Sequence, residues 1–176
     1  MALITQEYTI VEGGDTASGR TGETFYGNAL LTSNSYGAGI RFQNIELPKD
    51  GEIVSAILDF RQQSRDAYSI PSTKQVSRIY YEDSDNPLIF STSSPPYGRD
   101  RSVSYVEHEW DLDLYKESVT GQVIAQIDVT DLVDEIIARD GWVSGNSLAF
   151  IEKQGTGDTS GYISAGMKPL TSFHFK

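Results

Sequence analysis

Acidic residues that alternate along one segment are the first candidates for chemistry in this chain. Glu107, Glu109, Asp111 and Asp113 occupy every second position, and His108 stands between the first two. Because successive side chains of a β-strand point to opposite faces, an extended segment would place these carboxylates in one row. Such a row could bind a cation or supply an acid/base pair. The alternative, which we expect, is a solvated face whose opposite side packs into the core.

Oxygen-bearing side chains also gather in residues 82–87, directly after a strand-like segment. Glu82, Asp83 and Asp85 are candidate ligands for a cation, because Ca²⁺ prefers hard oxygen ligands. Their spacing does not match an EF-hand loop, and Asp and Asn before a proline are also ordinary turn residues. The sequence leaves two alternatives open here, a calcium site and a plain turn.

Three tyrosines lie in loop-like segments beside glycine or near asparagine, and they suggest a different kind of site. They are Tyr26, Tyr36 and Tyr97. Exposed aromatic rings can stack on the faces of sugars, and neighbouring amides can hydrogen-bond sugar hydroxyls. These residues are therefore candidates for a carbohydrate-binding platform. The alternative is that they pack at sheet edges.

Motifs of common catalytic sites are missing from the sequence. No serine stands in a nucleophile-elbow context, and the chain has neither a phosphate-binding loop nor a metal-spaced histidine cluster. It has no cysteine, which excludes thiolate chemistry and disulfides. We therefore expect a protein without enzymatic activity.

The charge of the chain limits the classes of partner. The net charge is −11, and an acidic surface repels phosphate backbones and anionic lipid headgroups. We therefore expect neither nucleic acid nor a membrane as a partner. The N-terminal residues have no basic start followed by a long apolar run, so a signal peptide is not predicted. From these features we expect a chain made in a cytoplasm.

The elements that must position these residues are mostly strands. Alternation of apolar and polar residues, with β-branched and aromatic enrichment, is typical of half-buried strands. Such strands are predicted at 3–11, 29–33, 39–45, 53–61, 77–82, 103–110, 112–114, 123–129, 147–152 and 170–175. Many short strands separated by turns favour a sandwich or jelly roll. No linker divides the chain, so we predict one all-β domain over 1–176, a jelly-roll β-sandwich with one short α-helix.

The predicted helix lies in the one segment whose apolar period is helical. Its stripe consists of Val129, Leu132, Val133, Ile136 and Ile137. Thr130 is the expected N-cap, with Arg139 in the last turn and Gly141 ending the helix. We expect this helix to cover an open end or edge of the sandwich. The predicted core comprises Ile57, Phe60, Ile79, Trp110, Leu132, Ile136 and Phe150.

The first half of the chain resembles the opening of DNRLRE-type β-sandwich domains. The resemblance rests on the small-residue segment at 26–32, Arg41-Phe42, Leu47-Pro48 and the strand-like segment at 51–58. In that family a small-residue strand leads into an arginine-containing strand, a Leu-Pro turn and an Ile-x-x-Ala-x-Leu strand. The closing half is similar at 128–133, Gly141-Trp142 and 145–150. Together the similar segments span most of the chain, and they imply a jelly roll.

The resemblance implies two functions of different classes. Domains of this family are appended to polysaccharide-active enzymes and surface adhesins, and similar sandwiches occur in structural proteins of tailed phages. We expect a virion structural protein, either a capsid decoration or a tail accessory subunit, made in the host cytoplasm and docked on capsid or tail proteins through the loop at 83–102. Such a subunit could also form a homo-oligomer. The alternative is an extracellular carbohydrate-binding module or adhesin domain that recognises a polysaccharide.

Overall fold

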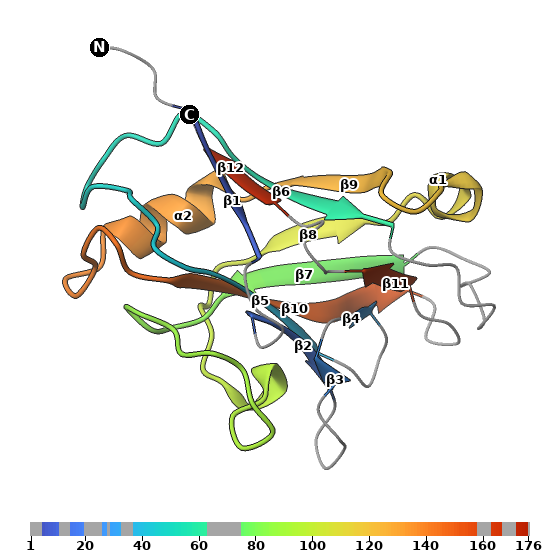
Figure 1. The fold of residues 1–176 in the computed structure, drawn as a ribbon, viewed down its shortest axis with the longest axis horizontal. Coiled ribbons are helices and arrows are strands. Elements are labelled where there is room, and N and C mark those ends of the chain that lie inside the picture. The colour runs from blue at the N-terminus through green and yellow to red at the C-terminus, as the bar shows by residue number, and fades with distance from the viewer. Residues whose placement is uncertain are drawn as a thin grey trace.

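The fold is described from a computed structural model, in which residues 5–10, 15–19, 26–27, 29–32, 37–62, 75–157, 163–166 and 172–175 are placed. Within these residues, the chain forms two antiparallel six-stranded sheets. The predicted all-β fold is confirmed, and Figure 1 shows the sheets stacked as two layers. The finer jelly-roll topology stays a prediction.

Sheet A contains strands from the start, the middle and the end of the chain. Its members are β1 (Gln6–Thr9), β4 (Ala29–Thr32), β6 (Ala56–Arg61), β9 (Val123–Asp128), β11 (Ile163–Gly166) and β12 (Ser172–Phe175). Their order is β1-β12-β6-β11-β4, and β9 also pairs with β6. Strand β6 therefore organises this sheet, because it pairs with three others.

Sheet B contains the strands that carry the candidate functional residues. Its members are β2 (Thr16–Gly19), β3 (Tyr26–Gly27), β5 (Gly37–Phe42), β7 (Gln75–Tyr81), β8 (Val106–Glu109) and β10 (Leu148–Gly157). The order is β3-β2-β5-β10-β7-β8, so β10 lies between β5 and β7 and β8 is an edge strand.

Helix α2 (Thr130–Ile137) covers one end of the sandwich, as predicted. It contacts β6 of sheet A and β7 of sheet B, and it lies at the left of Figure 1. Its four apolar residues Leu132, Val133, Ile136 and Ile137 are buried. Among the described residues, no helix is long and apolar enough to cross a membrane.

The predicted N-cap of α2 was wrong. Thr130 is the first helical residue, and its hydroxyl accepts a hydrogen bond from the Ala56 N–H at 2.9 Å, which ties the helix to β6. Val129 is the N-cap and makes no side-chain capping bond, whereas the carboxylate of the preceding Asp128 accepts from the Thr130 N–H at 3.0 Å and from the Thr130 hydroxyl at 2.5 Å. These bonds lower the pKa of Asp128.

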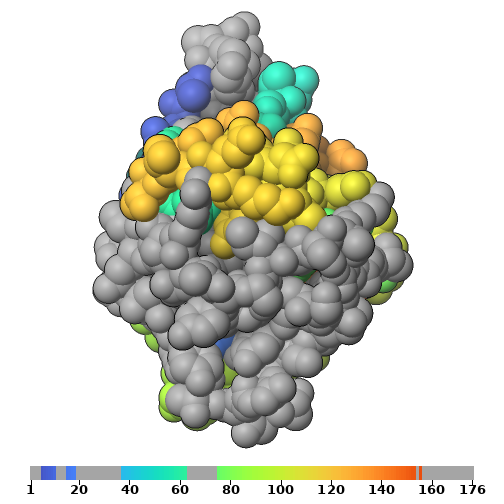
Figure 2. All heavy atoms as spheres, turned by 90° about the vertical axis from the view of Figure 1, so that its right-hand side faces the viewer, coloured from blue at the N-terminus to red at the C-terminus, as the bar shows by residue number. Residues whose placement is uncertain are grey.

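A second helix, α1 (Leu112–Glu117), forms where the alternation predicted a strand. Asp111 caps it, since its side chain accepts hydrogen bonds from the N–H groups of Asp113 at 3.1 Å and Leu114 at 2.8 Å. An aspartate in this position satisfies donors that an isolated helix start leaves free. The alternating pattern at 112–114 therefore misled the sequence prediction. Figure 2 views the molecule from the α1 end, where the described atoms of α1 and its flanks gather in the upper part.

The core lies between the two sheets and extends under α2. The predicted core residues Phe60, Ile79, Trp110, Leu132, Ile136 and Phe150 are all buried. Ile57 was predicted wrongly, because it is only half-buried. On β6, Ala56, Leu58 and Phe60 point into the core, and alternation puts Ile57 on the outer face.

Candidate binding surface

The loop at 83–102 packs against the outer face of sheet B. Phe90 from this loop forms a second buried cluster with Ala17, Ala149 and Ile151, three outward-facing residues of the sheet. Tyr80 of β7 packs at the edge of the cluster. The loop includes a short 3₁₀ helix, η2 (Pro96–Gly98). This outer face is therefore a packed layer and not an open sheet surface.

A glycine in β5 makes room for Phe90. A Cβ atom built on Gly39 would lie 2.5 Å from the Cζ atom of the Phe90 ring, which is closer than real Cβ contacts allow. Glycine in a strand costs packing and entropy, and it commonly marks such a close approach. Gly39 thus provides the space that the loop occupies.

We expect Gly39→Ala to lower the unfolding free energy by about 1–3 kcal/mol, because the added methyl group overpacks the Phe90 site. In urea unfolding, the double variant G39A/F90A should lose less stability than the two single variants together. Gly98→Ala in the same loop is the matched control, since nothing lies within 4 Å of its added Cβ. Strict additivity of G39A and F90A would contradict the proposed steric contact.

Arg99 organises the loop by binding its backbone. Its guanidinium donates hydrogen bonds to the carbonyl oxygens of Leu88 at 2.6 Å, Ile89 at 2.7 Å and Ser94 at 3.2 Å. The same group lies 4.4 Å above the centroid of the Phe90 ring. One planar cation therefore fixes the loop at three backbone positions and at its buried aromatic anchor.

The charge of Arg99 is balanced by a buried carboxylate. Nη1 of Arg99 lies 2.9 and 3.1 Å from the two oxygens of Glu82, and both side chains are almost fully buried. Burial raises the pKa of Glu82, whereas Arg99 opposes that shift. Removing either partner would leave the other charge in a poorly solvated site.

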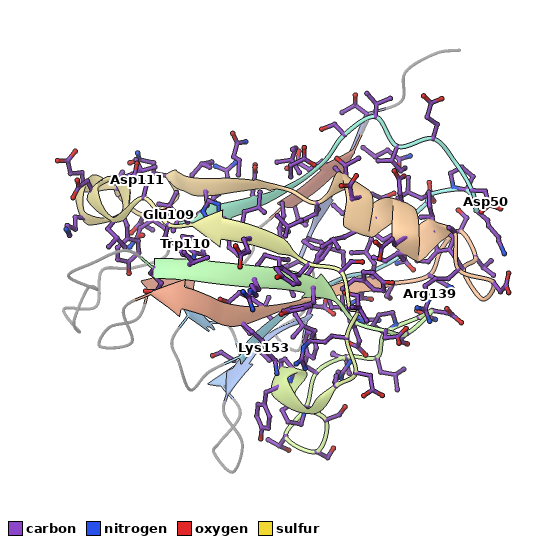
Figure 3. All side chains as sticks on the ribbon, turned by 180° about the vertical axis from the view of Figure 1, so that it is seen from behind. Asp50, Glu109, Trp110, Asp111, Arg139 and Lys153 are labelled. Carbon is purple, nitrogen blue, oxygen red and sulfur yellow. The ribbon has the colours of Figure 1, made fainter. Side chains whose placement is uncertain are left out.

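The start of the loop is held by a second arginine. Arg139, just beyond α2, binds the carboxylates of Asp83 at 2.5 Å and Asp85 at 2.6 Å, and these bonds raise the pKa of Arg139. Figure 3 shows Arg139 projecting beside this loop. A Cβ on Gly141 would lie 1.9 Å from an Asp85 oxygen, so Gly141 leaves room for this contact. Gly141 does not end α2 as predicted, because the helix ends at Ile137 with Ala138 as its C-cap, and Arg139 lies beyond its last turn.

The three predicted calcium ligands therefore have arginine partners. Asp83 and Asp85 meet at Arg139, whereas Glu82 faces Arg99. In the part of the chain that the structure describes, no three acidic or histidine side chains are grouped so that they could hold a metal ion. Calcium binding by this segment stays a prediction.

The three predicted sugar-binding tyrosines are not brought together by any described contact. Tyr97 belongs to η2 and is half-buried, and its Cβ lies 3.4 Å from a Cβ built on Gly37. Tyr26 belongs to β3, for which only the backbone is described, and Tyr36 lies outside the described residues. The carbohydrate platform also stays a prediction.

The row of four carboxylates is interrupted by the start of α1. Glu107 and Glu109 lie on β8, whereas Asp111 caps α1 and Asp113 belongs to its first turn. All four residues are exposed, which agrees with the solvated face that we expected. Figure 3 shows Glu109 and Asp111 on the same side of the chain, above Trp110, where β8 gives way to α1.

A buried polar network lies inside the sandwich near this end. The indole N–H of Trp110 donates to the Ser77 hydroxyl at 2.8 Å, and that hydroxyl donates to Oε1 of Glu152 at 2.5 Å. The His108 ring packs edge-on against Trp110, 5.0 Å between centroids. Burial raises the pKa of Glu152 to about 8 and lowers that of His108. Both groups are therefore uncharged near neutral pH.

A tyrosine–arginine surface lies on the outer face of sheet B beside the loop. We define it by Arg78, Tyr80, Arg101, Tyr105 and Lys153. The Tyr80 and Tyr105 rings are 5.3 Å apart and tilted by 50°. The guanidinium of Arg78 lies 4.7 Å from the Tyr105 centroid, and that of Arg101 lies 5.3 Å from the Tyr80 centroid. Aromatic rings and cations thus alternate across this surface.

Sequence reasoning missed both the Arg99 site and this surface. Arg99 follows two prolines in a segment without periodicity, and no local pattern assigns a partner to it. The signals that could have helped are Gly39 inside a strand and the alternation that places Arg78 and Tyr80 on one face.

Comparison with known proteins adds no relative: no protein-family model matches the chain, and a search of the curated proteins gives no match. The resemblance to DNRLRE-type domains therefore stays a prediction.

Proposed function

We propose that this chain is a non-catalytic structural subunit of a tailed-phage virion, a capsid decoration or tail accessory protein folded as one jelly-roll domain over 1–176. In this proposal it docks on the protein lattice of the particle through the loop at 83–102. The observation that carries the proposal is the exposure of two apolar residues in this loop, Leu88 at 75% and Ile89 at 42%. Arg99 binds the carbonyl oxygens of both residues, so the exposed apolar side chains are presented on a fixed backbone.

A fixed loop favours docking for an energetic reason. Association must offset the entropy lost when interface segments become ordered, and pre-ordering a loop removes part of that cost. Exposed aliphatic side chains on such a loop can then act as anchors in a partner's pocket. The Arg99 contacts therefore support a role in binding.

The candidate acid/base groups also support a non-catalytic role. The four carboxylates at 107–113 are exposed, and Glu82, Asp83 and Asp85 are paired with arginines. Glu152 is fully buried and bonded to Ser77. A general acid or base must reach the proton that it transfers, whereas these carboxylates are solvated, paired with an arginine or enclosed in the core.

The test is occupancy of virions or capsids that lack this subunit, measured by co-sedimentation. We expect wild-type protein to bind and Leu88→Asp to bind at least about tenfold more weakly, as for loss of an interface anchor. Val119→Asp is the matched control, because Val119 is 67% exposed and lies two residues after α1, at the opposite end of the sandwich from α2. Failure to bind any particle, together with retention on a polysaccharide affinity gel, would favour the extracellular carbohydrate-binding function instead.

A further inference from the structure

Among the described residues, two neighbouring cations of the tyrosine–arginine surface have no acidic partner. Every other lysine or arginine in the described ranges lies within 4.0 Å of a carboxylate. Arg101 and Lys153 have no such contact with the described residues. The chain has 25 acidic and 14 basic residues, so carboxylates are abundant. Two adjacent cations without a partner are therefore a distinct feature of this surface.

These cations lie close enough to repel each other. Burial, and to a smaller extent the charge of Arg101, lower the pKa of Lys153. Lys153 pairs in register with Arg78 across β10 and β7, so a third cation stands on the same face of the sheet. Figure 3 shows Lys153 on the side of sheet B that carries the loop. An anion bound here would relieve this repulsion.

The backbone that carries Arg101 is held in place. Arg101 forms an isolated bridge with Glu82, and the next residue, Ser102, is bonded to Tyr81 in two ways. The Ser102 N–H donates to the Tyr81 carbonyl at 2.9 Å, and the Ser102 hydroxyl accepts from the Tyr81 N–H at 3.1 Å. Arg101 is thus presented from a fixed segment, beside an aromatic ring.

Apolar surface adjoins the cations. Val103 is 95% exposed, and Tyr105 is 43% exposed. An open hollow of about 450 Å³ is lined by Tyr80, Arg101 and Val103, and also by Asp83 and Asp100. The hollow therefore combines positive charge, apolar contact area and nearby negative charge.

We propose that the tyrosine–arginine surface docks an acidic peptide segment of a partner protein, with a carboxylate on Arg101 and Lys153 and an adjacent apolar side chain on Tyr80, Tyr105 and Val103. The proposal rests on the proposed function, for which it names the chemistry of the docked partner. Arginine can bind a carboxylate in a bidentate manner, and the tyrosine rings and valine offer apolar contact. Asp83 and Asp100 in the same hollow would repel a polyanionic glycan or nucleic acid. They tolerate a peptide that carries a single carboxylate beside apolar residues.

The test is selection of a displayed random heptapeptide library on the immobilised full chain. We expect enriched peptides to carry Asp or Glu next to an aliphatic or aromatic residue. Synthetic versions of the leading peptides are then measured by fluorescence anisotropy against wild type and the double variant R101Q/K153Q. The double variant should bind at least tenfold more weakly. Changing the peptide's acidic residue to its amide should have a similar effect, and 0.5 M salt should weaken binding.

Lys116→Gln is the matched control, because Lys116 is an exposed lysine of α1 that is not among the residues of this surface, and this variant should bind peptide like wild type. Equal thermal stability of all variants shows that the fold is kept. Lack of enrichment, enriched peptides without acidic residues, or equal binding by the double variant would overturn the proposal. So would binding of tri-galacturonate that depends on Arg101 and Lys153, since the ligand would then be an acidic glycan.

Particle sedimentation separates this inference from the proposed function. If wild type and R101Q/K153Q occupy particles equally, the virion role stands and the acidic-peptide site is wrong. If acidic peptides bind as expected but no particle binds, the site stands and the virion role is wrong.

Discussion

Replacing Glu152 by glutamine is expected to raise the free energy of unfolding at pH 7 by about 3 kcal/mol. Glu152 is fully buried, and its pKa rises from 4.5 to about 8. At pH 7 the folded chain must therefore keep a proton that the unfolded chain releases. Glutamine is neutral in both states, and its amide oxygen can still accept the hydrogen bond that the Ser77 hydroxyl donates.

The pH dependence follows from the direction of this shift. The pKa of Glu152 is raised in the folded state. The stability that protonated Glu152 contributes is therefore fully present below pH 4.5 and is lost as the pH rises towards about 8. The increase in unfolding free energy caused by Glu152→Gln should accordingly be near zero at pH 4.5 and grow up to pH 8. His108, whose pKa is lowered by burial, titrates in both proteins, so the difference between them isolates Glu152.

Urea unfolding at several pH values between 4.5 and 8 measures this difference. The exposed Glu117 of α1 provides the matched control, and Glu117→Gln should change stability little at any of these pH values. A difference between Glu152→Gln and wild type that stays constant from pH 4.5 to 8 would show that Glu152 is ionised in the folded protein.

Replacing Arg99 by methionine is expected to destabilise the fold by about 3–5 kcal/mol at neutral pH, as for other broken buried ion pairs. The substitution leaves the Glu82 carboxylate buried without its partner and removes the hydrogen bonds to the carbonyls of Leu88, Ile89 and Ser94. Arg99→Lys should restore little of the loss, because an ammonium group cannot reproduce the planar fork of donors.

The stability lost in R99M should be smaller when Glu82 is replaced by a neutral residue. Without Arg99, only the charge of Arg41 still opposes the effect of burial on Glu82, and the folded pKa of Glu82 rises further. The destabilisation therefore grows as the pH rises above the unfolded pKa. R99M/E82Q should therefore be more stable than R99M at pH 7. Urea unfolding measures the free energies, and hydrogen exchange of amides in 83–102 reports release of the loop. The control is the exposed Arg101, which has no carboxylate partner among the described residues, since Arg101→Met should change stability by no more than about 0.5 kcal/mol. Wild-type exchange in R99M would contradict the role of Arg99.

Most strands and helix α2 could be predicted because their signals are local, whereas the short strands β2, β3 and β11 were not predicted. On β7, alternation puts Ile79 and Tyr81 on the core face and Tyr80 on the other. The helical stripe of α2 predicted its buried residues, because 3.6 residues per turn puts them on one side whatever the rest of the chain does. Both patterns depend only on the geometry of a short backbone segment.

Local patterns gave wrong predictions at α1 and at Ile57. In the first case a capping hydrogen bond started a helix, and in the second the packing of the sheets determined which face of a strand is buried. At α1, the alternation of apolar and acidic residues satisfied a strand pattern, but the Asp111 carboxylate stabilised a helix start. At Ile57, hydrophobicity predicted burial, yet the flanking Ala56 and Leu58 occupy the core face of β6. Apolar residues occupy both faces of β6, so the sequence does not show which face is buried. Only the packing of the two sheets decides this.

The candidate sites depended on tertiary structure for a different reason. Glu152 is an ordinary polar residue at the end of an apolar run until two sheets enclose it, and its raised pKa comes from that desolvation. Arg99 joins Glu82 only because the 83–102 loop folds back on sheet B, and Arg101 meets Lys153 across a large separation in sequence. Sequence alone determined the alternating strands and the apolar stripe of α2, since backbone geometry sets both periods. Which charges are paired, buried or left without a partner was decided only by the approach of distant segments, because charge–charge energies depend on distance and solvent exposure in space.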